Sequence, residues 1–234
     1  MSSPMDDDPR VYPVAAPGWA ALDRALRRIH PGKVPHQFTS RTPYEEDSLH
    51  PLPAVMAFAA DEPAHWHLVG YGCSELFDKT SPHPDVSGFG FEPSIRIPRS
   101  PEDERPPAWA VTLLQAVGHH VLFGGARLDT GHVVDLGGPI RPEPPTELCA
   151  CLCVPDPQLG KLDTPNGSVL VLQLFGLRAE ERDAVAEWDL ARKVHFAREV
   201  SPLCITDPDR PPFAEDARTK PIFRRYRLGV LVDG

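Results

Sequence analysis

Long hydrophobic runs are missing from this sequence of 234 residues. No apolar stretch approaches the roughly 20 residues that a membrane-spanning helix needs, so the sequence predicts no membrane partner. The first ten residues contain three consecutive aspartates, residues 6–8, and lack the basic and apolar segments of a secretion signal. We therefore expect a cytoplasmic protein.

Positive charge is also in short supply. The chain has 24 lysines and arginines against 33 aspartates and glutamates, for a net charge of −9. Such a balance disfavours nucleic acid or an anionic membrane as the main partner, because both are negatively charged. A protein or peptide partner with a basic surface is favoured instead.

Paired cysteine motifs are absent. The five cysteines are an odd number, and Cys149, Cys151 and Cys153 alternate along one predicted strand, where neighbours cannot readily form a disulfide. This usage favours a reducing compartment. Alternate histidines, His65 and His67, could chelate a metal, but zinc sites usually carry C-x-x-C spacing, and none occurs here. We expect buried thiols and hydrogen-bonded histidines, with no metal and no cofactor.

The common catalytic motifs fail as well. Ser74 lacks the second glycine of a nucleophile elbow, and neither Gly32-Lys33 nor Gly160-Lys161 has the earlier glycine of a P-loop. Gly88-Phe89-Gly90 is not followed by the third glycine of a dinucleotide-binding turn. We therefore predict no catalytic residues.

One alternative remains open, a metal- or thiol-dependent enzyme that uses His65, His67 and Cys73. Metal analysis of the purified protein distinguishes it from a binding protein.

What the sequence does contain is proline: 29 residues, against a usual share of roughly 5%. The prolines fall mostly between periodic segments, which indicates rigid turns. Because no repeat or domain-splitting linker is visible, the sequence predicts a single α+β domain. Its mixed, mainly antiparallel sheet would be covered by helices. We assign residues 15–234 to this domain and residues 1–14 to a flexible acidic tail.

The predicted centre of the fold is a pair of strands, residues 65–72 and 87–97. In the second, Phe89, Phe91, Ile95 and Ile97 alternate with polar residues and glycines, the period-two pattern of a half-buried strand. Residues 73–86 between them are too many for a tight hairpin and are expected to form a loop, a type of segment that is often functional.

Helical spacing predicts three helices, over residues 18–30, 108–123 and 179–198. The run Val169–Phe175 is apolar on both faces and predicts a central strand. Further strands are expected at residues 54–60, 131–136, 147–154, 203–205 and 227–232.

Several short motifs, in order and at similar spacing, resemble the signatures of the Suppressor of fused family. The resemblance extends over roughly residues 15–234 and matches the N-terminal domain of the two-domain animal proteins, as in single-domain bacterial members. It departs at Pro93, which stands in the strand after Phe91-Glu92. The motifs are His65-Trp66-His67, Gly72, Ser74-Glu75-Leu76, Ser87-Gly88-Phe89-Gly90-Phe91-Glu92, Pro107-Ala108-Trp109, Asp156-Pro157-Gln158, Thr164-Pro165-Asn166-Gly167 and Ile205-Thr206-Asp207.

This resemblance implies a mixed α/β domain that binds a protein or peptide and has no known catalysis. In the animal proteins the partner is a transcription factor, held as an added strand between two domains. Single-domain bacterial relatives are thought to be immunity proteins that neutralise toxins. An exposed strand edge could accept such a segment. Glu75 and Asp78 in the loop would meet basic groups of the partner, unless they are plain surface charges.

Overall fold

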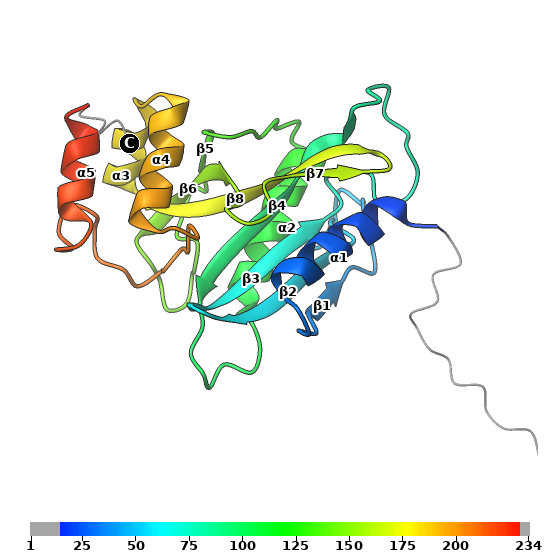
Figure 1. The fold of residues 1–234 in the computed structure, drawn as a ribbon, viewed down its shortest axis with the longest axis horizontal. Helices are drawn as coiled ribbons and strands as arrows, with labels where there is room; N and C mark the ends of the chain where they lie inside the picture. The colour runs from blue at the N-terminus through cyan, green and yellow to red at the C-terminus, as the bar shows by residue number, and fades with distance from the viewer. Residues whose placement is uncertain (1–14, 230–234) are drawn as a thin grey trace, which may run out of the picture.

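A mixed β-sheet forms the centre of the molecule in a computed structural model that describes residues 15–229 (Figure 1). Seven strands follow the order β1-β2-β3-β4-β8-β6-β5, and β7 pairs with β8. The β4–β8 pair is parallel and the other pairs are antiparallel, so the predicted α+β class is confirmed. The strands are β1 (His36–Thr39), β2 (Ala54–Asp61), β3 (Ala64–Tyr71), β4 (Val86–Pro98), β5 (Val133–Asp135), β6 (Leu148–Pro155), β7 (Lys161–Thr164) and β8 (Gly167–Arg178).

Helices cover both faces of this sheet. They are α1 (Pro17–Ile29), α2 (Ala108–Leu122), α3 (Ala179–Ala186), α4 (Leu190–Val200) and α5 (Lys220–Arg227). Helix α2 packs on one face, whereas α1 and the group α3–α5 lie on the opposite face, at different ends (Figure 1). Within the described residues, no helix is long and apolar enough to cross a membrane.

Strand β8 takes the central position that its apolar sequence predicted. Its side chains alternate between the layers: Leu172 and Leu174 join the α2 core, while Phe175 and Leu177 join the α3–α5 core. All four are almost completely buried. The alternation follows from the two-residue period of a strand with helices on both sides.

Strand β4 differs from the half-buried strand that the sequence predicted. Its polar face is buried too, with Glu92, Ser94 and Arg96 at 0% exposure, because the Glu92 carboxylate and the terminal nitrogens of Arg96 form hydrogen bonds inside the fold. Phe89, expected on the buried face, is 48% exposed. A register shift between Val86 and Phe91 interrupts the alternation there.

Three predictions near the C-terminus were wrong. The strand predicted at residues 203–205 is a turn followed by one isolated bridge, from Ile205 to Arg96. The segment 179–198 forms two helices: the first ends at Ala186, and Asp189 caps the second by accepting a hydrogen bond from the Arg192 amide at 2.8 Å. In place of the start of a last strand at residues 227–232, the chain forms α5 and a turn up to residue 229. Residues 230–234 and the predicted tail, residues 1–14, lie outside the described residues.

Candidate partner-binding surfaces

The loop at residues 73–86 is tied at its base by Glu92. The Glu92 carboxylate accepts hydrogen bonds from the amides of Gly72, Cys73 and Ser74 at 2.9–3.1 Å and from the Ser74 hydroxyl at 2.6 Å. Burial raises the pKa of Glu92 to about 7, against these donors, which favour its charged form. The glutamate of the family motif therefore has a structural role at the start of the loop.

Glu75 organises the middle of the same loop. It accepts hydrogen bonds from Lys79 Nζ at 2.8 Å, from the Gly88 amide at 3.1 Å, and from the amides of Thr80 and Ser81. Although burial works against its charge, these donors hold the pKa of Glu75 well below its usual range. Its side chain is only 9% exposed.

The interpretation of Glu75 as a free surface charge was therefore wrong. Its carboxylate oxygens already accept hydrogen bonds from the loop. Glu75 would therefore affect a partner through the loop conformation that it stabilises, not through direct contact. Asp78, by contrast, is exposed and takes part in no ion pair within residues 15–229. Of the two acidic residues singled out from the sequence, Asp78 is the one available to a partner.

A groove of about 1000 Å³ lies beside this loop, and we call it the Phe89 groove. Phe89, Val86 and Asp78 line one side, and Tyr44, Leu122 and Arg127 contribute from the segments before β2 and at the end of α2. Phe89 is presented here because Gly88 and Gly90 adopt positive φ angles of 55° and 86°. A side chain at position 88 would also lie 2.7 Å from the Cys73 carbonyl oxygen.

The histidines of the His65-Trp66-His67 motif belong to a different, buried environment. His67 is paired with Arg96 in the β3–β4 register, and its Nε2 atom lies 3.1 Å from Asp156 Oδ2. Arg96 donates to both oxygens of Asp156, at 2.5 and 3.2 Å, and to Gln158 and Gln173. Although burial opposes its charge, His67 and Arg96 hold the pKa of Asp156 well below its usual range.

His67, which contacts this ion pair, and His30, which contacts His67, are both neutral. Burial lowers the pKa of His67 to about 3 and that of His30 to about 4. His30 Nε2 lies 2.9 Å from His67 Nδ1, which fits a hydrogen bond donated by His30. The arrangement is a packed polar core between α1 and the α3–α5 group.

The residues of the alternative enzyme site, His65, His67 and Cys73, do not come together in the structure. Cys73 is buried in the α2 core, while His67 bonds to His30 at the end of α1, on the opposite face of the sheet. Burial and the nearby Glu92 raise the pKa of Cys73, which disfavours a reactive thiolate. His65 donates from Nδ1 to the Pro63 carbonyl at 2.6 Å. Within residues 15–229, no cluster of three or more histidine, cysteine or acidic residues could hold a metal ion.

Two of the three alternate cysteines, Cys151 and Cys153, fill a strand face as expected, whereas Cys149 is half-buried and lies near charged residues of α3. All five cysteines of the chain are free, and Cys151 and Cys153 pack in the α2 core. Burial raises the pKa of Cys151 above its usual range and that of Cys153 to about 12.

The sheet ends at two strands, β1 and β5. In the described part of the chain no strand lies beyond either of them, and β5 also borders a pocket. On the inner side of β5, the His132 carbonyl accepts from the Cys153 amide at 2.8 Å and the Leu136 amide donates to the Cys149 carbonyl at 3.0 Å. Because antiparallel pairing alternates, the backbone N–H and C=O groups of Val133 and Asp135 point away from the sheet.

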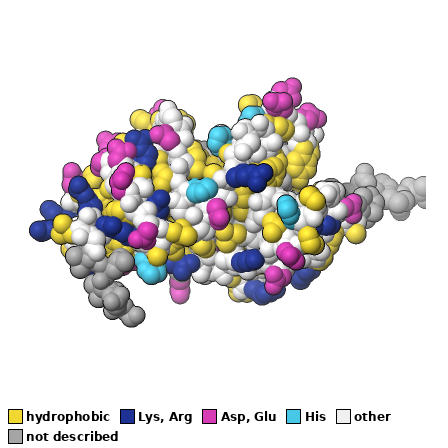
Figure 2. All heavy atoms as spheres, turned by 90° about the horizontal axis from the view of Figure 1, so that it is seen from above, with side chains coloured by type: hydrophobic (Ala, Val, Ile, Leu, Met, Phe, Trp, Pro, Cys, Tyr) yellow, Lys and Arg dark blue, Asp and Glu magenta, His cyan; other side chains and the backbone are white. Residues whose placement is uncertain are grey.

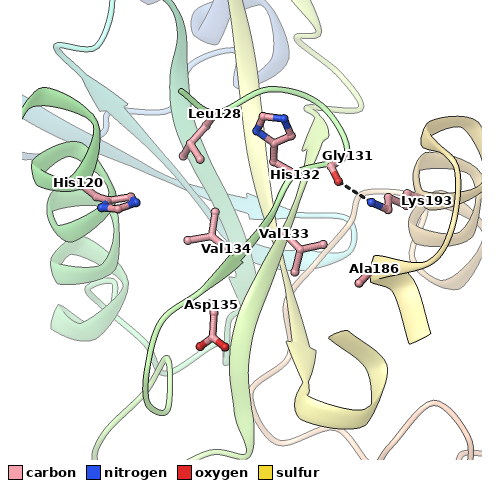
Figure 3. A pocket seen from close by; sticks show the side chains of 9 residues that line it. All are labelled: His120, Leu128, Gly131, His132, Val133, Val134, Asp135, Ala186 and Lys193. Atoms are coloured by element: carbon pink, nitrogen blue, oxygen red, sulfur yellow. Dashed lines mark hydrogen bonds between the residues drawn. The ribbon is translucent and has the colours of Figure 1, made fainter. Parts of the chain in front are cut away.

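A pocket of about 470 Å³, the edge pocket, lies along this strand (Figure 3). His120, Leu128 and Val134 lie toward α2, and Ala186 and Lys193 lie toward the α3–α4 side. Lys193 Nζ donates to the Gly131 carbonyl at 3.1 Å, just before β5. A segment added to β5 would thus have walls for the side chains on both of its faces.

Known proteins are similar to this chain in sequence and in fold. A model of the Suppressor of fused protein (SUFU) family matches residues 50–211. The chain belongs to the Suppressor of fused family. The Suppressor of fused homologs of Homo sapiens and Mus musculus are each 29% identical to it over 208 residues, which cover 81% of this chain and 42% of theirs. The chain thus spans less than half the length of these curated relatives.

Solved structures of Suppressor of fused proteins share the fold. Drosophila Suppressor of Fused is 25% identical, with a TM-score of 0.78 over 92% of this chain and 54% of that chain. A chain of the Sufu–Fu complex is 24% identical, with a TM-score of 0.79 over 94% of this chain and 100% of that one. A protein described as a SUFU homolog, from Neisseria gonorrhoeae, gives 0.57 at 15% identity over 83% and 96%.

Sequence reasoning did not predict the polar core or which strands end the sheet. The half-buried strand predicted at residues 87–97 put Arg96 on the face away from the core. His30 was predicted only as the end of a helix, and Asp156 only as part of a family motif. One signal was available: Gln173 is the single polar residue in the apolar run 169–175, and a lone polar group in a central strand needs a buried partner. Which strand ends the sheet depends on pairing between distant segments, which the sequence pattern does not show.

Proposed function

We propose that this chain is a non-enzymatic binding domain that accepts a segment of a protein or peptide partner as an added strand on β5. The observation that carries the proposal is the free β5 edge, with outward backbone groups at Val133 and Asp135 beside the edge pocket. The Sufu–Fu complex supports it, since a relative of the same fold assembles with another protein.

We further propose that the partner presents a basic surface and that binding takes place in the cytoplasm. The net charge of −9 favours a basic partner, and five free cysteines suit a reducing compartment. Following the resemblance to single-domain bacterial members, the function proposed for such a partner is that of a toxin, with this chain as its immunity protein.

The test uses the product of the gene adjacent to the one encoding this chain, with affinity measured by calorimetry. Val133→Pro removes an amide that points away from β6, so the fold should persist while affinity falls at least about tenfold. Val133→Ala keeps the amide and should bind like the native chain. Native affinity in Val133→Pro would exclude strand addition at β5. No binding by the native chain would contradict the proposed immunity function.

A further inference from the structure

The Phe89 groove is a second concave surface, and strand addition at β5 does not use it. It is about twice the volume of the edge pocket, and both border the segment 120–128 at the end of α2: His120 and Leu128 line the edge pocket, Leu122 and Arg127 the groove. The two surfaces therefore share one short segment in their linings.

Hydrogen bonds within the protein fix the backbone around the groove, so a partner does not have to order it on binding. Glu75 binds the Gly88 amide, and the Phe89 amide donates to the Cys73 carbonyl at 2.9 Å, so the backbone on both sides of the ring is fixed. Across the groove, Tyr44 is 45% exposed and has a φ angle of 63°, which is uncommon outside glycine. A rigid, half-exposed aromatic residue contributes contact area at low entropic cost.

The charge around the groove is one-sided. Asp78 lines the groove, and four more exposed carboxylates stand next to lining residues in the chain: three follow Tyr44, and one precedes Val86. None of them takes part in an ion pair within residues 15–229, and Arg127 is the one exposed lysine or arginine among the described residues lining the groove. These carboxylates are Glu45, Glu46, Asp47, Asp78 and Asp85. Clustered, unpaired charges of one sign attract a partner of the opposite sign.

We infer that the Phe89 groove binds a segment of the partner in which a large apolar side chain is flanked by lysine or arginine. The apolar side chain packs against Phe89 and Tyr44, and the flanking cations meet the carboxylates at the rim. The inference rests on the proposed function only in that the segment belongs to a protein partner. The groove provides a contact separate from the β5 edge.

Two synthetic peptides test the groove without the natural partner. They are acetyl-Arg-Lys-Leu-Phe-Lys-Arg-amide and acetyl-Glu-Asp-Leu-Phe-Asp-Glu-amide, which share the apolar pair and differ in the sign of their charges. Titration followed by NMR should show saturable binding of the basic peptide and none of the acidic one. Phe89→Ser should weaken that binding about tenfold or more, whereas Leu228→Ser, which also truncates an exposed apolar side chain, should not.

A second variant changes the charge at the rim and leaves Phe89 and Tyr44 in place. Asp78→Lys should weaken binding of the basic peptide and reduce its dependence on salt. Equal binding of both peptides, no binding at millimolar concentration, or native affinity in Phe89→Ser would overturn the inference. So would a dimer of the native chain that Phe89→Ser dissociates, since a second copy would then occupy the groove. Peptide binding that persists in Val133→Pro separates this site from the β5 edge.

Discussion

At the scale of single residues, the polar core around Arg96 explains why the motif His65-Trp66-His67 contains histidines without a reactive site. Arg96 and Asp156 are both completely buried, and a buried ion pair is tolerated only when further hydrogen bonds satisfy its remaining atoms. Gln158, Gln173 and neutral His67 supply such bonds to the terminal nitrogens of Arg96 and to Asp156, while Arg96 Nε has no partner among the described residues. The motif therefore maintains the packing between the two helical groups of one sheet face.

The neutral histidines make stability depend on pH. Burial lowers the pKa of His30 to about 4, below its ordinary value of 6.5, so the unfolded chain binds a proton that the native state does not. The contribution of His30 to stability is therefore present above pH 6.5 and is lost as the pH falls toward 4. We expect urea unfolding to show a free energy that declines over this range.

His30→Gln tests the assignment, because glutamine can still donate a hydrogen bond to His67 but does not titrate. In this variant the slope of stability against pH should decrease by roughly 1.4 kcal/mol per pH unit or less between pH 6 and 4.5. His36→Gln, at a position on β1 with no hydrogen bond to the polar core, should leave the slope unchanged. Identical slopes in all three proteins would mean that His30 titrates normally.

At the scale of elements, regular segments were predictable and their interruptions were not. The apolar periodicity of residues 18–30, 108–123 and 169–175 located α1, α2 and the centre of β8. The exposure of Phe89 depends on the positive φ angles of the two glycines beside it. The break at Asp189 depends on a cap within an otherwise helical pattern. Neither of these outcomes follows from hydrophobic periodicity.

In the loop 73–86, the sequence predicted that Glu75 contacts a partner, whereas the structure shows that Glu75 stabilises the loop itself. Glu75→Gln should lower the free energy of unfolding by about 1–3 kcal/mol, since it removes a charged acceptor from several hydrogen bonds. Amide hydrogen exchange in residues 76–88 should become faster. Asp78→Asn, the matched exposed carboxylate in the same loop, should change stability by less than about 0.5 kcal/mol. Equal effects of the two substitutions would contradict the organising role of Glu75.

At the scale of the whole molecule, acidic character and binding surfaces are unevenly distributed. Figure 2 shows charged side chains of both signs around the end of the molecule where α3–α5 lie. There the arginines are used in pairs, such as Arg225 with Glu199 and Arg182 with Asp135. The carboxylates around the Phe89 groove take part in no ion pair within residues 15–229, and Arg127 is the one exposed cation that lines it, so a basic partner would be attracted most strongly to that region.

This distribution predicts how fast a basic partner associates. In stopped-flow measurements with the neighbouring gene product, the on-rate of the native chain should fall as ionic strength rises, because salt screens long-range attraction. Reversing the rim acids Glu45, Glu46, Asp47 and Asp78 to lysine should slow association about tenfold or more at low salt and flatten its salt dependence. A control that reverses four acids elsewhere has the same net charge but should slow association much less. These control positions are Glu104, Asp163, Glu187 and Glu215, each exposed and outside every ion pair within residues 15–229. If the two variants associate at the same rate, net charge alone steers the encounter and the groove has no special part in it.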